Sequence, residues 1–199
     1  MERNNDWINN IVDEDFLQDN LTFVSLFIAV YENFTDYVVS NIEFLLCEET
    51  IENGEIVIKK TEIYQDEIKN RIVDNKKNKD ITKASFLWLK DNNAISSDDY
   101  DLFSKIKSIR NKYAHELTNI ILSGVDGKEE VKAFFEMIAL YKKITKWWFI
   151  NIEVAIMGYE INEGDEICNL ANEALDVIID VLYNGKSEEY KKIIRDLEK

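Results

Sequence analysis

The stretch "LTFVSLFIAVYENFTDYVVSNI", residues 21–42, decides the fold class that we expect for this chain. Its apolar side chains recur mostly every three or four residues, which is the repeat of an amphipathic α-helix. The acidic run at 13–15 just before it suits the positive N-terminal end of such a helix. The pattern therefore predicts one long helix over residues 13–47. The side chains that carry it are Phe16, Leu17, Asn20, Phe23, Val24, Phe27, Val30, Tyr31, Phe34, Val38 and Ile42.

Similar helical spacing continues along most of the remaining sequence. The chain has no proline and only six glycines, so few positions would interrupt a helix. Asn53-Gly54 followed by "EIVIKK" predicts a small β-hairpin insert near 53–60. We expect an all-α fold, a bundle of long up-down helices with short extra helices, forming a single domain over residues 1–199. The further expected helices cover 61–73, 81–91, 98–122, 128–158 and 165–183, with a charged helix at the end.

Composition and charge restrict the classes of partner. Hydrophobic residues make up 46% of the 199 residues and aromatic residues 12%, which is enough apolar material for a core. The formal net charge is −15. This charge argues against sequence-blind nucleic-acid binding and against docking on anionic lipid, since both depend on Lys and Arg. The net charge is compatible with a locally basic site, and it favours binding of a basic partner.

The sequence indicates a soluble, cytoplasmic protein with no membrane partner. The longest apolar run, residues 21–31, is shorter than the ~20 residues that span a bilayer. The first residues lack the positive region and apolar run of a signal peptide. Cys47 and Cys168 have no CxxC spacing, so we expect two free thiols in a reducing compartment.

The only histidine, His115, lies in "SIRNKYAHEL", residues 108–117, within the helix expected over 98–122. At about 100° per residue, His115 falls opposite the apolar stripe of that helix, so its ring should point outward. Asn111 lies one turn earlier on the same outer face, and Arg110 lies at the edge of the stripe. This places the trio either on an ordinary solvent-facing surface or on a face that meets a partner. The expected stripe consists of Leu102, Ile106, Ile109, Tyr113 and Leu117.

A basic stretch surrounds this histidine. Residues 104–115 contain Lys105, Lys107, Arg110 and Lys112 and no acidic residue. In so acidic a chain, this stretch would give phosphate a local binding site, with the three lysines as substrate-binding residues. The alternative is that the helix dipole alone favours acids at the start of the helix and bases later.

An arginine and a histidine near one phosphate fit metal-free RNA cleavage. The 2′-hydroxyl attacks the adjacent phosphorus, and the imidazole of His115 suits the proton transfers. The guanidinium of Arg110 can hold the phosphate and stabilise the developing charge, while Asn111 orients the ring or contacts phosphate. Acid–base cleavage needs two groups, and a twofold homodimer would bring two copies of His115 to one cleft. A water molecule or a lysine is the alternative second group.

The motif "RNKYAHE" resembles the R-x(4–6)-H motif of the HEPN superfamily, whose commonest form reads R-N-x-x-A-H. Residues 84–116, "ASFLWLKDNNAISSDDYDLFSKIKSIRNKYAHE", also resemble the usual run of a short helix, an "IS" turn and the motif helix. The match covers residues 84–122 well. Elsewhere only the layout of long helices agrees.

The resemblance implies an α-helical bundle that dimerises through the motif helix, here 98–122. It implies a metal-independent endoribonuclease of a toxin–antitoxin or phage-defence system, with Arg110 and His115 catalytic and Asn111 assisting. An antitoxin or another defence-system component would be its partner, and RNA its substrate. Leu117 replaces the tyrosine that members paired with a nucleotidyltransferase antitoxin often carry, which argues against adenylylation.

Some members of that family lack nuclease activity, and the net charge of −15 keeps this alternative open. The competing hypothesis is a non-catalytic dimerisation module that recruits a partner protein or a nucleotide. We expect no metal and no cofactor, because one histidine and two distant cysteines make no zinc site. "KWWF", residues 146–149, fits core and dimer packing better than base stacking.

Overall fold

The computed structural model describes residues 13–73, 76–77, 80–125 and 127–158. Its described elements are helices with only small antiparallel strand pairs, which confirms the all-α prediction with a hairpin insert. The helix expected over 165–183, the final charged helix and Cys168 lie outside the described residues. Within the described ranges, no helix combines the length and the apolar character that crossing a membrane requires.

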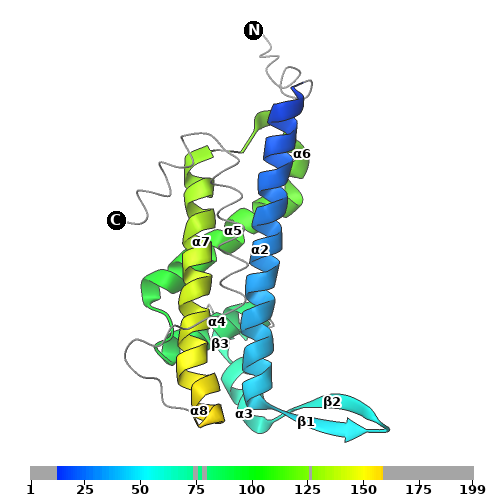
Figure 1. Ribbon diagram of the computed structural model, residues 1–199, viewed down its shortest axis with the longest axis vertical. Helices are drawn as coiled ribbons and strands as arrows, with labels where there is room; N and C mark the ends of the chain where they lie inside the picture. Colours follow the sequence, from blue (N-terminus) through cyan, green and yellow to red (C-terminus); the bar gives the residue numbers. More distant parts are fainter. Residues whose placement is uncertain (1–12, 74–75, 78–79, 126, 159–199) are drawn as a thin grey trace. The chain divides into compact units, whose positions relative to one another are not determined.

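The chain divides into two compact units, one of residues 1–30 with 101–199 and the other of residues 31–100. Helix α2 (Glu14–Leu46) continues through the first boundary and α5 (Ser97–His115) through the second (Figure 1). The single domain expected over residues 1–199 stays a prediction. Each unit is described by itself below.

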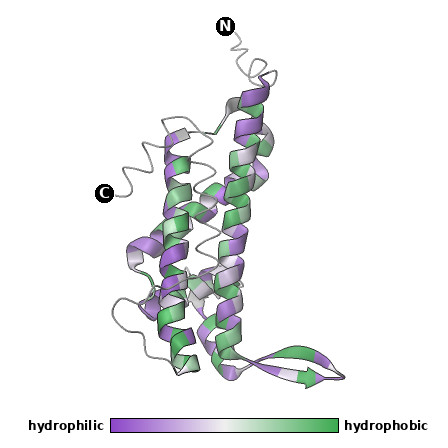
Figure 2. Cartoon of the chain, in the orientation of Figure 1, coloured by the Kyte–Doolittle hydropathy of each residue, from purple (hydrophilic) through white to green (hydrophobic). Residues whose placement is uncertain are grey.

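The long helix expected from the sequence is present as α2, with 33 residues. Asp13 begins it by accepting hydrogen bonds from the backbone N–H groups of Phe16, at 3.0 Å to its Oδ1, and of Leu17. The apolar and polar residues along α2 are visible in Figure 2. Its expected apolar residues from Phe23 to Ile42 are all buried, so the three-and-four spacing predicted the inner face correctly.

The first unit contains the N-terminal part of α2, most of α5, and the helices that follow. These are α6 (Leu117–Ser123), α7 (Gly127–Trp148), the π-helical segment η2 (Phe149–Glu153) and α8 (Val154–Met157). The helix expected over 128–158 is therefore present, with its last part as a π-helical turn and a short α-helix.

An aromatic cluster joins three helices of the first unit. Phe27 of α2 lies 5.1 Å, between ring centroids, from Tyr113 of α5 and 5.9 Å from Phe134 of α7. Phe23 packs edge-on against both Tyr113 and Phe134. Such edge-to-face pairs add about 0.5–1.5 kcal/mol each beyond the area they bury. The cluster therefore fixes α5 against α2 and α7.

The end of α6 is tied to the start of α2. Gly124 has a φ of +82°, and a Cβ atom there would lie 2.8 Å from the Phe16 ring, so this position requires glycine. The next residue, Val125, donates its N–H to Asn20 Oδ1 at 2.8 Å. Asn20 itself donates to the Phe16 carbonyl at 2.7 Å.

Tyr141 of α7 makes the stability of the first unit sensitive to alkaline pH. Burial raises the pKa of Tyr141 to about 12 from its usual value of 10. The neutral phenol is favoured by folding, so this stabilisation is complete below pH 10 and is lost as the pH rises from 10 towards 12. Over this range we expect the free energy of unfolding to fall less steeply in Tyr141→Phe than in wild type. The two slopes should differ by up to about 1.4 kcal/mol per pH unit. Urea unfolding of both proteins between pH 9 and pH 12 checks this, and parallel curves for the two would contradict it.

The second unit starts with the C-terminal part of α2 and contains the expected hairpin, β1 (Cys47–Glu52) and β2 (Glu55–Lys60). Asn53 and Gly54 form its turn with φ values of 53° and 83°, as a type I′ turn requires. The helix expected over 61–73 is interrupted. The chain instead forms α3 (Glu62–Tyr64), the π-helical segment η1 (Gln65–Lys69) and the strand β3 (Ile72–Val73), which pairs with β4 (Lys76–Lys77).

Side-chain hydrogen bonds attach the base of the hairpin to α2 and α3. The Thr61 hydroxyl donates to the Leu46 carbonyl and accepts from the Tyr64 N–H, so it also caps α3. The Tyr64 hydroxyl donates to Glu43 Oε1 at 2.9 Å. Only the base of the hairpin is held in this way, because its outer residues are exposed.

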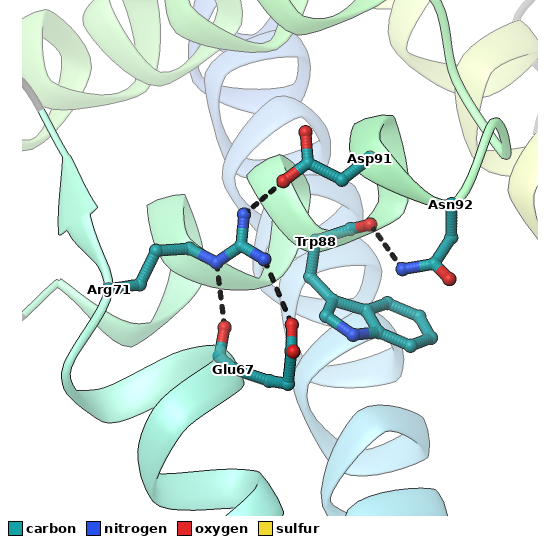
Figure 3. Close-up of polar contacts among 5 residues, drawn as sticks. All are labelled: Glu67, Arg71, Trp88, Asp91 and Asn92. Atoms are coloured by element: carbon teal, nitrogen blue, oxygen red, sulfur yellow. Dashed lines mark hydrogen bonds and ion pairs between the residues drawn. The ribbon is translucent and has the colours of Figure 1, made fainter.

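The expected helix over 81–91 is present as α4 (Ile81–Asp91), and an arginine holds it to the preceding segment (Figure 3). Arg71 donates to the Glu67 carbonyl at 2.7 Å and to Glu67 Oε2 at 3.1 Å, and it also contacts the Asp91 carboxylate. Asn92 closes α4 by donating its side-chain amide to the Trp88 carbonyl at 2.9 Å. Because all five donors of Arg71 are on a planar fork, one side chain can bridge both elements.

The start of α5 carries a reciprocal side-chain cap. The Ser96 hydroxyl accepts from the Asp99 N–H at 3.1 Å, and Asp99 Oδ2 accepts from the Ser96 N–H at 2.7 Å. This reciprocal arrangement is a capping box, which fixes where α5 begins.

Candidate functional site

The buried face of α5 sets the direction of the candidate site residues. Phe103, Ile106 and Tyr113 are each 0% exposed. Leu102 and Ile109 are half-buried, so the expected stripe is centred slightly differently and includes Phe103, which the sequence reasoning missed. Because the aromatic cluster holds Tyr113, the opposite face of α5 is turned away from the core of its unit.

The prediction of one helix over 98–122 is wrong at its C-terminal part. Helix α5 ends at His115 and α6 begins at Leu117. Glu116 between them has φ −117° and ψ 21°, far from helical values, although its N–H still donates to the Lys112 carbonyl. The break removes Leu117 from the expected stripe, and its side chain is 40% exposed.

The structure joins two members of the trio. Arg110 Nη1 donates to Asn111 Oδ1 at 3.3 Å, and both side chains are half-buried. This bond orients the Asn111 amide, whose oxygen accepts from the guanidinium. It also holds one edge of the guanidinium beside the outer face of α5.

His115 is separate from that pair. It is exposed at the last residue of α5, as the helical spacing predicted. Among the described residues it makes no hydrogen bond and no ion pair, with Arg110, Asn111 or any other side chain. The imidazole is therefore accessible, and its second partner in acid–base chemistry would have to come from elsewhere.

Two of the three expected substrate-binding lysines have carboxylate partners on α7. Lys105 Nζ lies 3.1 Å from Glu129 Oε2, and Lys112 Nζ lies 2.9 Å from Glu130 Oε1. Glu130 is only 6% exposed, so its charge is held close to Lys112 in a poorly solvated place. Lys107 is half-buried.

These ion pairs change the interpretation of residues 104–115 as an uncompensated basic stretch. The acids that neutralise it come from the first turn of α7, 18 and 24 residues away in sequence. Sequence reasoning missed Glu129 and Glu130 because no local spacing links them to the lysines. The signal available was only that acids begin α7, as a helix N-terminus favours.

Other candidate features have structural roles. Trp148 is 2% exposed and packs beside Trp147, which fits the expected core role of residues 146–149. Within the described ranges, no group of three or more His, Cys, Asp or Glu side chains could hold a metal ion. Cys47 is a free thiol, and burial together with Glu43 raises its pKa.

Three polar side chains of the motif lie on α5. Arg110 lies at the edge of the buried stripe and is hydrogen-bonded to Asn111, and His115 is open to solvent on the same helix. A guanidinium and an imidazole can bind phosphate and transfer protons without a metal. A single chain supplies one imidazole, so an acid and a base together require a second group.

Comparisons with known proteins identify no family for this chain. No family model matches the sequence, and neither a curated protein nor a solved structure matches the chain.

Proposed function

We propose that this chain is a metal-independent endoribonuclease of the HEPN type. The 2′-hydroxyl of RNA attacks the adjacent phosphorus, and a base removes its proton. The bond from phosphorus to the 5′-oxygen breaks, and an acid protonates that oxygen. The products are a 2′,3′-cyclic phosphate and a free 5′-hydroxyl. His115 transfers a proton, and Arg110 stabilises the charge on the phosphoryl oxygens. Asn111 positions the Arg110 guanidinium, with which it shares a hydrogen bond.

The observation that carries this proposal is the placement of His115. Its ring is exposed at the end of α5, one turn beyond the hydrogen-bonded pair of Arg110 and Asn111. An imidazole with no partner among the described residues can accept a proton from an incoming hydroxyl. The R-N-x-x-A-H spacing supports the same assignment by resemblance.

We propose that the active form is a homodimer in the cytoplasm. Two copies of α5 would contribute their outward faces to one cleft, so that one His115 acts as base and the other as acid. Lys105, Lys107 and Lys112 would hold the flanking phosphates. An antitoxin or another defence-system protein would restrain the enzyme.

The direct test incubates purified protein with total RNA in excess EDTA. We expect cleavage to persist, because no step uses a metal ion, and the fragments to end in cyclic phosphate. A short RNA that contains a mapped cleavage site and its fully 2′-O-methylated counterpart form the matched pair, and only the unmodified RNA should be cut. Intact RNA, or cutting of the methylated strand, would overturn the mechanism. Sedimentation of the same protein checks the dimer.

A second candidate function is a non-catalytic module that binds a partner protein or a nucleotide. The pairing of Lys105 with Glu129 and of Lys112 with Glu130 favours it, because these cations are already compensated. Expression in cells separates the two functions. An unrestrained ribonuclease should arrest growth and its His115→Ala variant should not, whereas a binding module should leave growth unchanged in both cases.

A further inference from the structure

The hairpin of the second unit exposes an apolar face that the proposed RNA chemistry does not use. Ile51 is 77% exposed, Ile56 71% and Ile58 53%. Hydrophobic residues along both strands are visible in Figure 2. Exposed isoleucines are costly in a soluble protein when they are grouped, and such groups mark interaction sites.

The register of the hairpin places these side chains together. Ile51 pairs with Ile56, and Glu49 pairs with Ile58 two residues further along. Residues that are directly opposite share a face, and so do residues two apart along a strand. The three isoleucines and Glu49 therefore lie on one face, which we call the isoleucine face.

This face continues into a hollow at the end of α2. The hollow is lined by Ser40, Glu43 and Phe44 of α2 and by Cys47, Glu49 and Ile58 of the hairpin. Phe44 is 64% exposed, so its ring adds to the apolar surface rather than to the core. Ile58 and Glu49 belong to both the hollow and the isoleucine face, which makes one continuous surface.

The charges at this surface are mostly negative. Lys60 is occupied by Glu43, at 3.5 Å, and lies 5.2 Å from the centre of the Tyr64 ring. Lys59, on the other face, is occupied by Glu52 at 2.6 Å. In the described part of the chain, Glu49 takes part in no ion pair and is exposed. A ligand on this surface therefore meets the free carboxylate of Glu49, whereas the ammonium group of Lys60 is already paired with Glu43.

We propose that the isoleucine face, with Phe44, is a docking surface for a protein segment that is apolar at its centre and carries Lys or Arg at its flanks. The apolar centre covers the isoleucines, and a basic flank pairs with Glu49. The same charges disfavour the other occupants. An anionic membrane would be repelled, and a second copy of this face would bring two Glu49 carboxylates together.

The surface belongs to the second unit, whereas Arg110, Asn111 and His115 belong to the first. The proposal therefore does not depend on RNA cleavage. It assigns a partner-binding role to the hairpin whether or not the chain is an enzyme.

The test uses a displayed library of random peptides, selected on the full chain and counter-selected on the double variant Ile51→Ser/Ile56→Ser. We expect the selected peptides to have apolar centres and Lys or Arg flanks. Recovery of no peptide, or of peptides with no basic enrichment, would overturn the proposal. Both isoleucines are more than two-thirds exposed, so the variant should keep its fold, which circular dichroism checks.

One selected peptide, fluorescently labelled, then measures affinity by anisotropy. Each of Ile51→Ser and Ile56→Ser should weaken binding about tenfold, because each removes an aliphatic side chain buried on binding. The matched control is Ile63→Ser, which changes an isoleucine of α3 that is 61% exposed but outside the face, and it should change Kd less than twofold. Equal losses in all three variants would contradict the assignment to this face.

Glu49→Gln separates the charge contribution from the apolar one. We expect it to weaken the peptide severalfold at about 50 mM salt and to have little effect at about 500 mM, where charges are screened. No effect at low salt would overturn the basic-flank assignment. Binding of wild type to phosphatidylserine vesicles, or a dimer that only the isoleucine variants dissociate, would replace the proposed partner with a membrane or a second copy.

Discussion

His115→Ala should reduce RNA cleavage by about 100- to 10,000-fold, which is the usual contribution of a positioned general acid or base. The ring is exposed and makes no hydrogen bond within the described residues, so its removal should change the free energy of unfolding by less than about 0.5 kcal/mol. The measurements are single-turnover cleavage in EDTA and urea unfolding of the same preparations.

The matched control for this variant is Ser108→Ala, which truncates another exposed side chain on the outer part of α5. It should cleave at the wild-type rate. Arg110→Lys tests the guanidinium separately. It keeps the charge but loses the planar fork, and we expect a loss of about 100- to 1,000-fold. Cleavage by His115→Ala at close to the wild-type rate would remove the enzymatic proposal and leave the binding module.

Phe27→Ala should destabilise the first unit by about 3–5 kcal/mol, the largest stability effect that we expect from one substitution. Phe27 is 0% exposed and contacts the rings of Phe23, Tyr113 and Phe134. The variant loses the transfer free energy of the ring and leaves a cavity at the junction of α2, α5 and α7. Urea unfolding, followed by tryptophan fluorescence, measures the loss.

The control for the core is Leu21→Ala on the same helix, whose side chain is 36% exposed, and its cost should be well under that of Phe27→Ala. The loss of stability in Phe27→Leu should lie between those of Phe27→Ala and Leu21→Ala, because leucine keeps part of the volume of the phenylalanine side chain. If Phe27→Ala and Leu21→Ala are equally stable, the aromatic cluster is not the core that fixes α5.

Much of the fold follows from short-range rules that a sequence displays. The spacing in residues 21–42 predicted α2, because apolar residues that recur every three or four positions lie on one face of a helix. Asn53-Gly54 predicted the hairpin turn because both positions need a positive φ. Ser96 and Asp99, which form the cap of α5, are only three residues apart, so this contact also belongs to the short-range class.

The predictions that were wrong concern contacts between residues distant in sequence, or a helix end that no helix-breaking residue marks. Nothing in "HELT", residues 115–118, is a helix breaker, so the end of α5 at His115 could not be foreseen. The compensation of Lys105 and Lys112 depends on how α7 packs beside α5 in their unit. The outward direction of His115 was predictable because it needs only the helical period and the buried positions of Ile106 and Tyr113.

The carboxylates on Lys105 and Lys112 have a consequence for how a polyanion would associate with α5. A phosphate that reaches either ammonium competes with Glu129 or Glu130 for it, so binding there is in part an exchange of one anion for another. An exchange of this kind releases fewer condensed cations from the polymer than binding to free lysines does. The logarithm of the association constant would then fall with a shallow slope against the logarithm of salt concentration, and discrimination among RNAs would depend on shape more than on total charge.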